Sequence, residues 1–223
     1  MTWSDLTVIA PFAAVVVVAA LVILADIVKP GNRHLALGVV LAGLAIVGLL
    51  TLWTGQAPGT AFGGMYKVDH LTTFLDLIFV AIVALSCLFA PDYLEPRGLP
   101  IAEFVAILVF ALGGAMLVAA SADLLVLFLG LELMVIPGYM LAGYHKRDAL
   151  STEGAVKYFL LGSFSSALFL FGLAYVWCLT GSTRIADVAA RVGDIVAGQA
   201  PLSPVLQLWL AFLPPSSPFT RYA

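Results

Sequence analysis

Long apolar stretches separated by short polar breaks dominate the chain. A helix needs about 20 apolar residues to cross a hydrocarbon core of roughly 30 Å, and six stretches come close to or exceed this length. They run approximately over residues 6–28, 35–53, 71–90, 101–120, 124–144 and 155–179. Each of them predicts one membrane-spanning helix. The glycine-rich break 54–69 and the proline-rich break 91–100 are predicted as loops.

This pattern predicts an all-α integral membrane protein, a multi-span bundle with six full transmembrane helices. A seventh apolar stretch, 202–213, is too short to span and predicts an incomplete helix before the Pro/Ser-rich tail 214–223. Segment 183–197 differs, because apolar residues follow helical spacing on one face and charges alternate in sign on another. That pattern is typical of an amphipathic helix at a membrane surface, and a solvated linker is the alternative.

The composition agrees with a membrane protein, since 62% of the residues are hydrophobic and only 10% are charged. Soluble domains carry about 25% charged residues. No basic cluster exceeds His145-Lys146-Arg147, so nucleic acid is not expected as a partner. Cys87 and Cys178 lie in separate apolar stretches, and the sequence contains neither a paired-cysteine motif nor a nucleotide-binding glycine motif. We therefore expect no cofactor to be bound by this chain.

The distribution of Lys and Arg predicts the orientation in the membrane, because cytoplasmic loops carry an excess of these residues. Five of them lie in the first, third and fifth loops: Lys29, Arg33, Arg97, Lys146 and Arg147. The N-terminal tail and the second and fourth loops hold only Lys67, and the segment after the sixth stretch holds Arg184 and Arg191. The bias places the odd-numbered loops in the cytoplasm and the N-terminus on the outer side.

Glu132 is the leading candidate for a functional residue. It lies within the fifth apolar stretch, roughly 12 Å from one end and 18 Å from the other by helical rise, and so near the membrane midplane. Its neighbours at helical spacing are apolar, so a partner must come from another helix. An embedded carboxylate costs about 2.5–3.5 kcal/mol on insertion scales and usually faces a protein interior or a cavity. We interpret Glu132 as a proton-binding residue, and a purely structural carboxylate is the alternative.

Other polar residues in the stretches receive weaker interpretations. Lys157, near the start of the sixth stretch, is a candidate second relay, although its long side chain could instead extend to the interface. Asp76 is a second embedded acid without an assigned role. Pro137 is expected to bend the fifth helix, since it lacks an N–H group. Ser121 or Asp123 is expected to cap that helix.

Small residues on the fourth and sixth stretches are expected to allow close helix packing rather than to take part in chemistry. They are Gly113, Gly114, Gly162, Ser165, Ser166 and Gly172.

The central part of the sequence resembles a known family. The matching residues are Glu103-Phe104, Gly113 to Ser121, Asp123-Leu124-Leu125, Leu129 to Leu133, Tyr139, Ala142-Gly143-Tyr144, Asp148, Ser151, Glu153, Lys157 to Gly162 and Thr180 to Thr183. Together they resemble the N subunit of bacterial NADH–quinone oxidoreductase, respiratory complex I.

The resemblance implies an antiporter-like, proton-translocating subunit in the cell inner membrane, associated with the other membrane subunits of complex I and with the lipid bilayer. Residues 1–100 would form the N-terminal three-helix region, and residues 101–213 the first part of an antiporter-like helical repeat. Glu132 matches the family's key glutamate, which in the family pairs with a lysine on the seventh helix. NADH, FMN, iron–sulfur clusters and quinone would be bound by partner subunits.

Two alternatives stay open at this point. Subunits of cation/proton antiporters and membrane-bound hydrogenases share the general pattern. The chain also lacks the family's seventh-helix lysine, so it is expected to be truncated, and an inactive fragment is the third interpretation.

Overall fold

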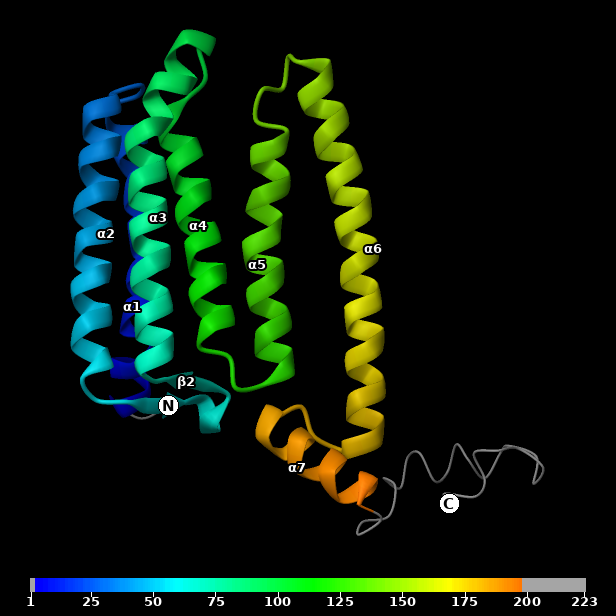
Figure 1. Cartoon of the computed structure of the whole chain (residues 1–223). Coiled ribbons are helices and arrows are strands. Elements are labelled where there is room, and N and C mark those ends of the chain that lie inside the picture. Colours follow the sequence, from blue (N-terminus) through cyan, green and yellow to red (C-terminus); the bar gives the residue numbers. More distant parts are fainter. Residues whose placement is uncertain (1–2, 198–223) are drawn as a thin grey trace.

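The computed structural model describes residues 3–197, and these residues are almost entirely helical (Figure 1). The long helices are α1 (Trp3–Val28), α2 (Arg33–Gly55), α3 (His70–Leu94), α4 (Ile101–Ala119), α5 (Leu124–Ala142) and α6 (Ala149–Thr180). Within the described residues, these six are long and apolar enough to cross a membrane. The predicted all-α multi-span fold is confirmed. The predicted incomplete seventh helix, 202–213, and the tail 214–223 lie outside the described residues.

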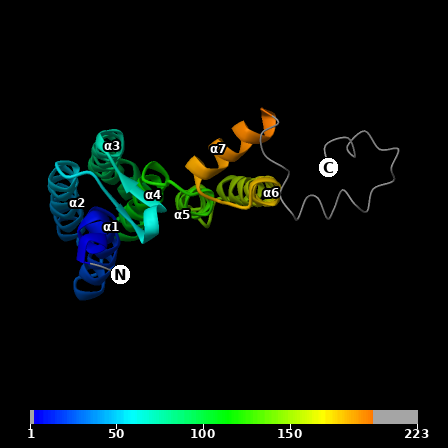
Figure 2. The same cartoon turned by 90° about the horizontal axis from the view of Figure 1, so that it is seen from below.

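Helices α1 to α4 pack around one apolar core, and α5 and α6 extend from it in a row (Figures 1 and 2). The core is built from small and branched side chains, which let the helices approach closely. Its fully buried members include Val15 and Val22 of α1, Leu44 of α2, Cys87 of α3 and Val109 of α4. Helix α5 packs against α4, whereas α6 packs against α5 and leaves its other faces uncovered in residues 3–197.

Side-chain caps set the first residues of four helices. Asn32, Asp69, Asp123 and Asp148 each accept a backbone N–H bond from the first turn of the helix that follows. Of the two predicted caps for α5, Asp123 is therefore the correct one. At Asp69, the N–H of Thr72 at 2.9 Å and then the Lys67 ammonium hold the pKa of the carboxyl at about 2. These caps satisfy donors that a helix start leaves free.

The predicted loops contain more structure than the sequence indicated. Segment 54–69 folds into a hairpin of β1 (Gly59–Ala61) and β2 (Tyr66–Val68), joined by the short 3₁₀ turn η1 (Phe62–Gly64). Helix α3 continues through Pro91 to Leu94 and is followed by η2 (Glu95–Arg97), so the prediction that the helix ends before Pro91 was wrong. A proline is tolerated in a membrane helix when neighbouring groups satisfy the freed carbonyl.

The hairpin is joined by backbone hydrogen bonds to the turn between α4 and α5. The N–H of Lys67 donates to the carbonyl of Ala120 at 2.7 Å, and the N–H of Ala122 donates to Met65 at 2.9 Å. Strand β2 therefore gains a partner on its free edge, which a two-stranded hairpin needs for stability.

The same turn is bonded to the link that follows α6. The N–H of Leu124 donates to Thr183 at 2.9 Å, and the N–H of Ile185 donates to Ala122 at 3.1 Å. The Arg184 guanidinium also donates to the carbonyl of Gly63 in the hairpin turn. We call this hydrogen-bonded set, residues 59–68, 120–125 and 183–185, the belt.

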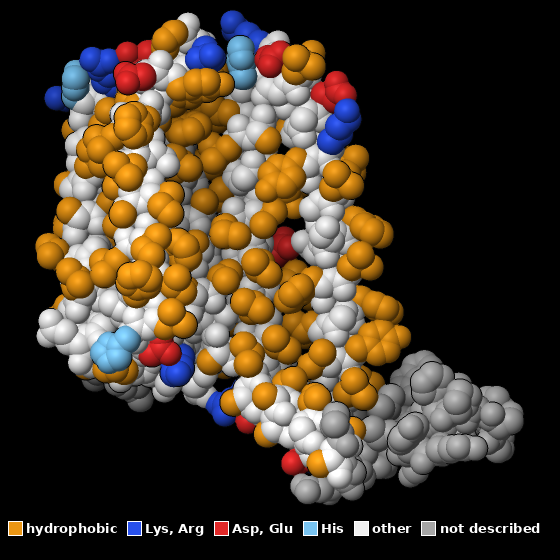
Figure 3. Space-filling model, viewed as in Figure 1, with side chains coloured by type: hydrophobic (Ala, Val, Ile, Leu, Met, Phe, Trp, Pro, Cys, Tyr) orange, Lys and Arg blue, Asp and Glu red, His pale blue; other side chains and the backbone are white. Residues whose placement is uncertain are grey.

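The amphipathic segment forms α7 (Ile185–Val196), which lies at the lower ends of α5 and α6 (Figure 1). The expected helix is thus confirmed, whereas its contact with a membrane surface stays a prediction. The belt and α7 lie at one end of the bundle, and most basic side chains gather at the opposite end (Figure 3). There, Arg33 binds both carboxylate oxygens of Glu95, at 2.5 and 2.7 Å.

We expect the basic end to face the cytoplasm. A reporter fused after Arg147 should read as cytoplasmic, and one fused near Gly59 should read as outside, because positively charged loops are retained on the cytoplasmic side. A second fusion after Arg33 serves as the control and should match the one after Arg147. The opposite pattern would contradict the predicted orientation.

Candidate functional site

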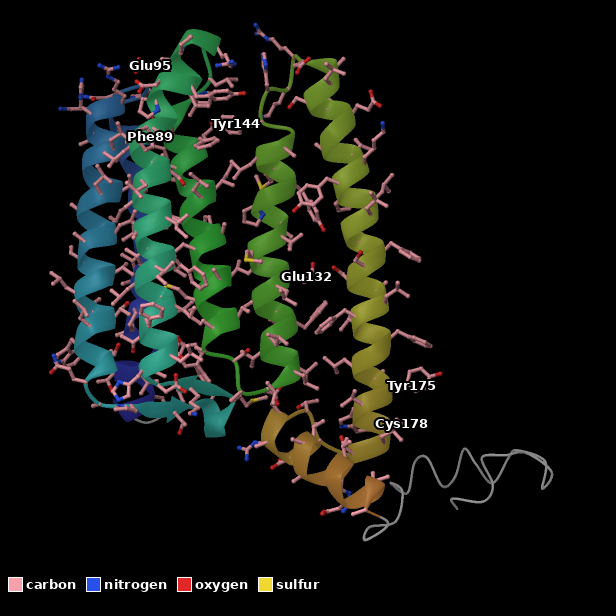
Figure 4. All side chains as sticks on the ribbon, in the orientation of Figure 1. Phe89, Glu95, Glu132, Tyr144, Tyr175 and Cys178 are labelled. Atoms are coloured by element: carbon pink, nitrogen blue, oxygen red, sulfur yellow. The ribbon has the colours of Figure 1, made fainter. Side chains whose placement is uncertain are left out.

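Helix α5 carries Glu132 on the face that is turned towards α6. Its opposite face lies against α4, where Gly130 and Pro137 are buried. Glu132 comes two residues after Gly130, which places it on nearly the opposite side of α5. Its carboxylate therefore lies away from the core that α1 to α4 form. Glu132 is only half-buried by the described residues, and it lies between α5 and α6 (Figure 4).

A pocket of about 300 Å³ occupies the space between these two helices. Helix α5 contributes Phe128, Leu131, Glu132, Val135 and Tyr139, and α6 contributes Tyr158, Gly162, Ser165, Ser166 and Phe169. The surface is visibly hollowed along this seam in Figure 3. The pocket therefore combines one carboxylate with four hydroxyl-bearing side chains inside an otherwise apolar wall.

Ser166 is the direct partner of the carboxylate, since its hydroxyl donates a hydrogen bond to Glu132 Oε1. Ser166 was expected from the sequence to be a small packing residue, so this role was not predicted. A signal was present, because Ser166 and Glu132 both lie near the middle of their apolar stretches. A hydroxyl at the same depth can donate a hydrogen bond to an embedded acid, which offsets part of the free-energy cost of burying that acid.

Aromatic pairs bound the pocket along the helices. Towards the belt, Phe128 and Phe169 stack with ring centroids 5.8 Å apart. Towards the basic end, the Tyr139 ring meets the edges of Tyr158 at 4.8 Å and Phe159 at 5.6 Å. These contacts mark the two ends of the hydroxyl-lined space along the helices.

Lys157 lies outside this pocket. Its ammonium pairs with Glu153 one turn earlier on α6, and both side chains are largely exposed. Lys157 and Glu153 line a separate depression together with Lys146 and Arg147 at the basic end. The structure therefore does not bring Lys157 to Glu132, and its relay role stays a prediction.

Asp76 is the other embedded acid, and it is 3% exposed within α3. Among the described residues, its Oδ1 has no hydrogen-bond partner. Asp76 does not line the pocket that contains Glu132. Burial, and secondly the charge of Asp76, raise the pKa of the Tyr66 phenol on β2.

Residues 121–219 match the family described as the transmembrane region of NADH:quinone oxidoreductase and Mrp antiporters. Subunit N of the NADH-quinone oxidoreductase of Chloroflexus aggregans is 35% identical over 198 residues, which cover 86% of this chain and 40% of that protein. Subunit N from Desulfovibrio desulfuricans is 36% identical over 190 residues, covering 85% and 38%. The chain is similar to the antiporter-like membrane subunits of NADH–quinone oxidoreductases.

Solved structures of respiratory complexes agree with this family. A chain of respiratory complex I from Thermus thermophilus superposes with a TM-score of 0.66 at 28% identity, over 90% of this chain and 41% of that one. A chain of an archaeal membrane-bound sulfane sulfur reductase gives a TM-score of 0.70 at 22% identity, which supports the fold alone. The chain thus spans about 40% of the length of the relatives it matches.

The part of the chain from residue 3 to 197 contains no group of three or more His, Cys, Asp or Glu side chains that could hold a metal ion. Within this part, the titratable groups of the pocket are Glu132 and two tyrosines, and its lining includes no Lys, Arg or His. The chemistry that the arrangement offers is proton binding and release at a carboxylate, assisted by neighbouring hydroxyls.

Proposed function

We propose that this chain takes part in proton translocation by a respiratory NADH–quinone oxidoreductase, with Glu132 as the residue that binds and releases the proton. The observation that carries the proposal is the Glu132 carboxylate in the α5–α6 pocket, held there by Ser166. The family match supports the coupling to quinone reduction. NADH, FMN, iron–sulfur clusters and quinone would then be bound by partner subunits.

The pocket suits such a residue because the Ser166 hydroxyl donates to the carboxylate and the space beside it is open to an approaching charge. In general, a cation close to a carboxylate favours its ionised form. A conformational change that moves a cation towards or away from Glu132 would therefore load or release the proton. Lys157, at the basic end, is the proposed relay that delivers protons to this region, and it would have to leave Glu153 in order to do so.

The exposed surface of α6 is consistent with the proposed contacts with lipid and with other membrane subunits. Its outer faces expose large apolar side chains, namely Leu160, Leu161, Phe164, Leu168 and Phe171. Such a surface fits the hydrocarbon region of the inner membrane or a neighbouring membrane subunit. The proposed topology has the N-terminus on the outer side.

A cation/proton antiporter subunit is the second candidate, because the matched family also includes Mrp antiporters. The two candidates differ in their driving force. Pumping that starts on addition of NADH supports the first, and proton movement that needs only a sodium gradient supports the second.

The deciding experiment replaces Glu132 in the complete subunit within the assembled complex. Glu132→Ala and Glu132→Gln should lower NADH-driven proton pumping by about 10²-fold, the lower end of what one acid–base group contributes. Glu132→Asp should retain more activity, since it keeps a carboxyl group. Pumping is measured with a pH-gradient dye in membrane vesicles, and assembly by native gel electrophoresis.

Asp92→Asn is the matched control, because it neutralises an exposed carboxylate at the end of α3. It should pump like the wild type. Normal pumping by Glu132→Gln in an assembled complex would overturn the proposed function and leave Glu132 with a structural role.

A further inference from the structure

The pocket continues past Glu132 towards the basic end, where Tyr139 forms part of its wall. Tyr139 follows Glu132 by two helical turns, so the two side chains share one face of α5. The Tyr139 hydroxyl oxygen is buried, and in residues 3–197 it has no hydrogen-bond partner. A buried hydroxyl without a partner is costly, so its position needs a reason.

The surroundings of Tyr139 hold this hydroxyl in one place. A Cβ atom added to Gly162 would lie 1.8 Å from the Tyr139 hydroxyl oxygen, so only glycine leaves room for it there. The rings of Tyr158 and Phe159 contact the Tyr139 ring edge-to-face, at 4.8 and 5.6 Å. The Tyr139 ring therefore packs among side chains of α6, and its hydroxyl lies against α6 at Gly162.

The volume and the lining of the pocket suit ordered water. Its 300 Å³ has room for several water molecules, each of which needs two to four polar partners. The Glu132 carboxylate and the hydroxyls of Tyr139, Ser165 and Ser166 supply such partners from both helices. Ser165 donates to the carbonyl of Leu161 and keeps its acceptor positions available.

We propose that Tyr139 is a hydrogen-bonding relay in a water-containing passage that connects Glu132 with the basic end of the bundle. This inference rests on the proposed function of Glu132. In each transfer, the Tyr139 O–H bond breaks as its proton passes to the acceptor on the Glu132 side. A protonated water on the other side gives one proton to the same oxygen and becomes neutral water, so a new O–H bond forms and Tyr139 stays neutral. Protonation of Glu132 ends the sequence.

The test compares two tyrosine-to-phenylalanine changes in the complete, assembled complex. Tyr139→Phe removes the hydroxyl and keeps the ring contacts, and it should lower the proton-pumping rate about fivefold, the effect of one lost hydrogen bond of average strength. Tyr175→Phe is the matched control, because Tyr175 is exposed on α6 and points away from α5 (Figure 4). It should pump at the wild-type rate.

A second readout separates a relay from a packing residue. The infrared C=O stretch of protonated Glu132, identified by its loss in Glu132→Gln, should shift in Tyr139→Phe and stay in place in Tyr175→Phe. An unshifted band, or wild-type pumping by Tyr139→Phe while Glu132→Gln is inactive, overturns the relay and leaves the proposed function intact. If Glu132→Gln pumps normally, the proposed function fails as well.

Discussion

Replacing Gly114 with alanine is expected to destabilise the chain by about 2–3 kcal/mol, whereas the same change at the adjacent Gly113 should leave its stability between the wild-type value and about 1 kcal/mol above it. A Cβ atom on Gly114 would lie 2.3 Å from the backbone nitrogen of Met134 and 2.7 Å from the carbonyl carbon of Leu133. Both atoms belong to the backbone of α5, so the clash is relieved only by moving α4 and α5 apart. On Gly113, the nearest atom would be a Val15 methyl group at 3.5 Å, an ordinary contact.

The neighbouring position makes a close control, because alanine gains about 1 kcal/mol of helix propensity over glycine at either site. The difference between the two variants therefore reports the approach of α4 to α5. Unfolding of each variant in mixed micelles, followed by circular dichroism as the denaturing detergent fraction rises, gives the comparison. Equal midpoints for Gly114→Ala and Gly113→Ala would mean that the helices do not pack this closely.

Removing the Asp123 carboxylate should cost about 2–3 kcal/mol, because it both caps α5 and bonds the link after α6. Asp123 is fully buried; its Oδ1 accepts the N–H of Leu125 at 2.8 Å, and its Oδ2 accepts the hydroxyl of Thr183 at 2.7 Å. Asp123→Ala leaves both donors without that acceptor. The expected result is a lower unfolding midpoint together with faster proteolysis after residue 180.

Asp148→Ala is the comparison for this second change. Asp148 also caps a helix, but it is half-buried, and within residues 3–197 its carboxylate bonds only the nearby N–H groups of Leu150 and Ser151, at 3.3 Å each. It should cost about 1 kcal/mol or less, the usual value of a helix cap. If the two alanine variants lost equal stability, the Asp123–Thr183 contact would contribute nothing beyond local capping.

The long helices and the embedded acid could be predicted from the sequence because each rests on a local property. Twenty apolar residues are enough to indicate a span, and one carboxylate inside a span is visible without knowledge of its neighbours. The cap at Asp123 could be predicted for the same reason, because it bonds a backbone N–H only two residues later. Only the ends of the helices were misplaced: α6 begins at Ala149 rather than near residue 155, and α3 continues past Pro91.

The features that the sequence analysis missed depend on partners far away in the chain. The strands β1 and β2 are only three residues long, and β2 gains bonds from the α4–α5 turn that no local pattern reveals. The bond from Ser166 to Glu132 joins residues 34 positions apart. Lys157 is the exception, because its partner Glu153 lies four residues earlier on the same helix, a spacing that is visible in the sequence.

The belt also constrains the order in which parts of the chain can fold during synthesis. Arg184 is synthesised 121 residues after its hydrogen-bond partner Gly63, and the bonds of Thr183 and Ile185 to the α4–α5 turn form only once α6 has crossed the membrane. Until then, the hairpin and the start of α5 lack their last partners. Chain synthesis runs at about 5–20 residues per second, so this end of the bundle stays unfinished for several seconds after the hairpin emerges. That interval is when a membrane chaperone or a protease would meet it.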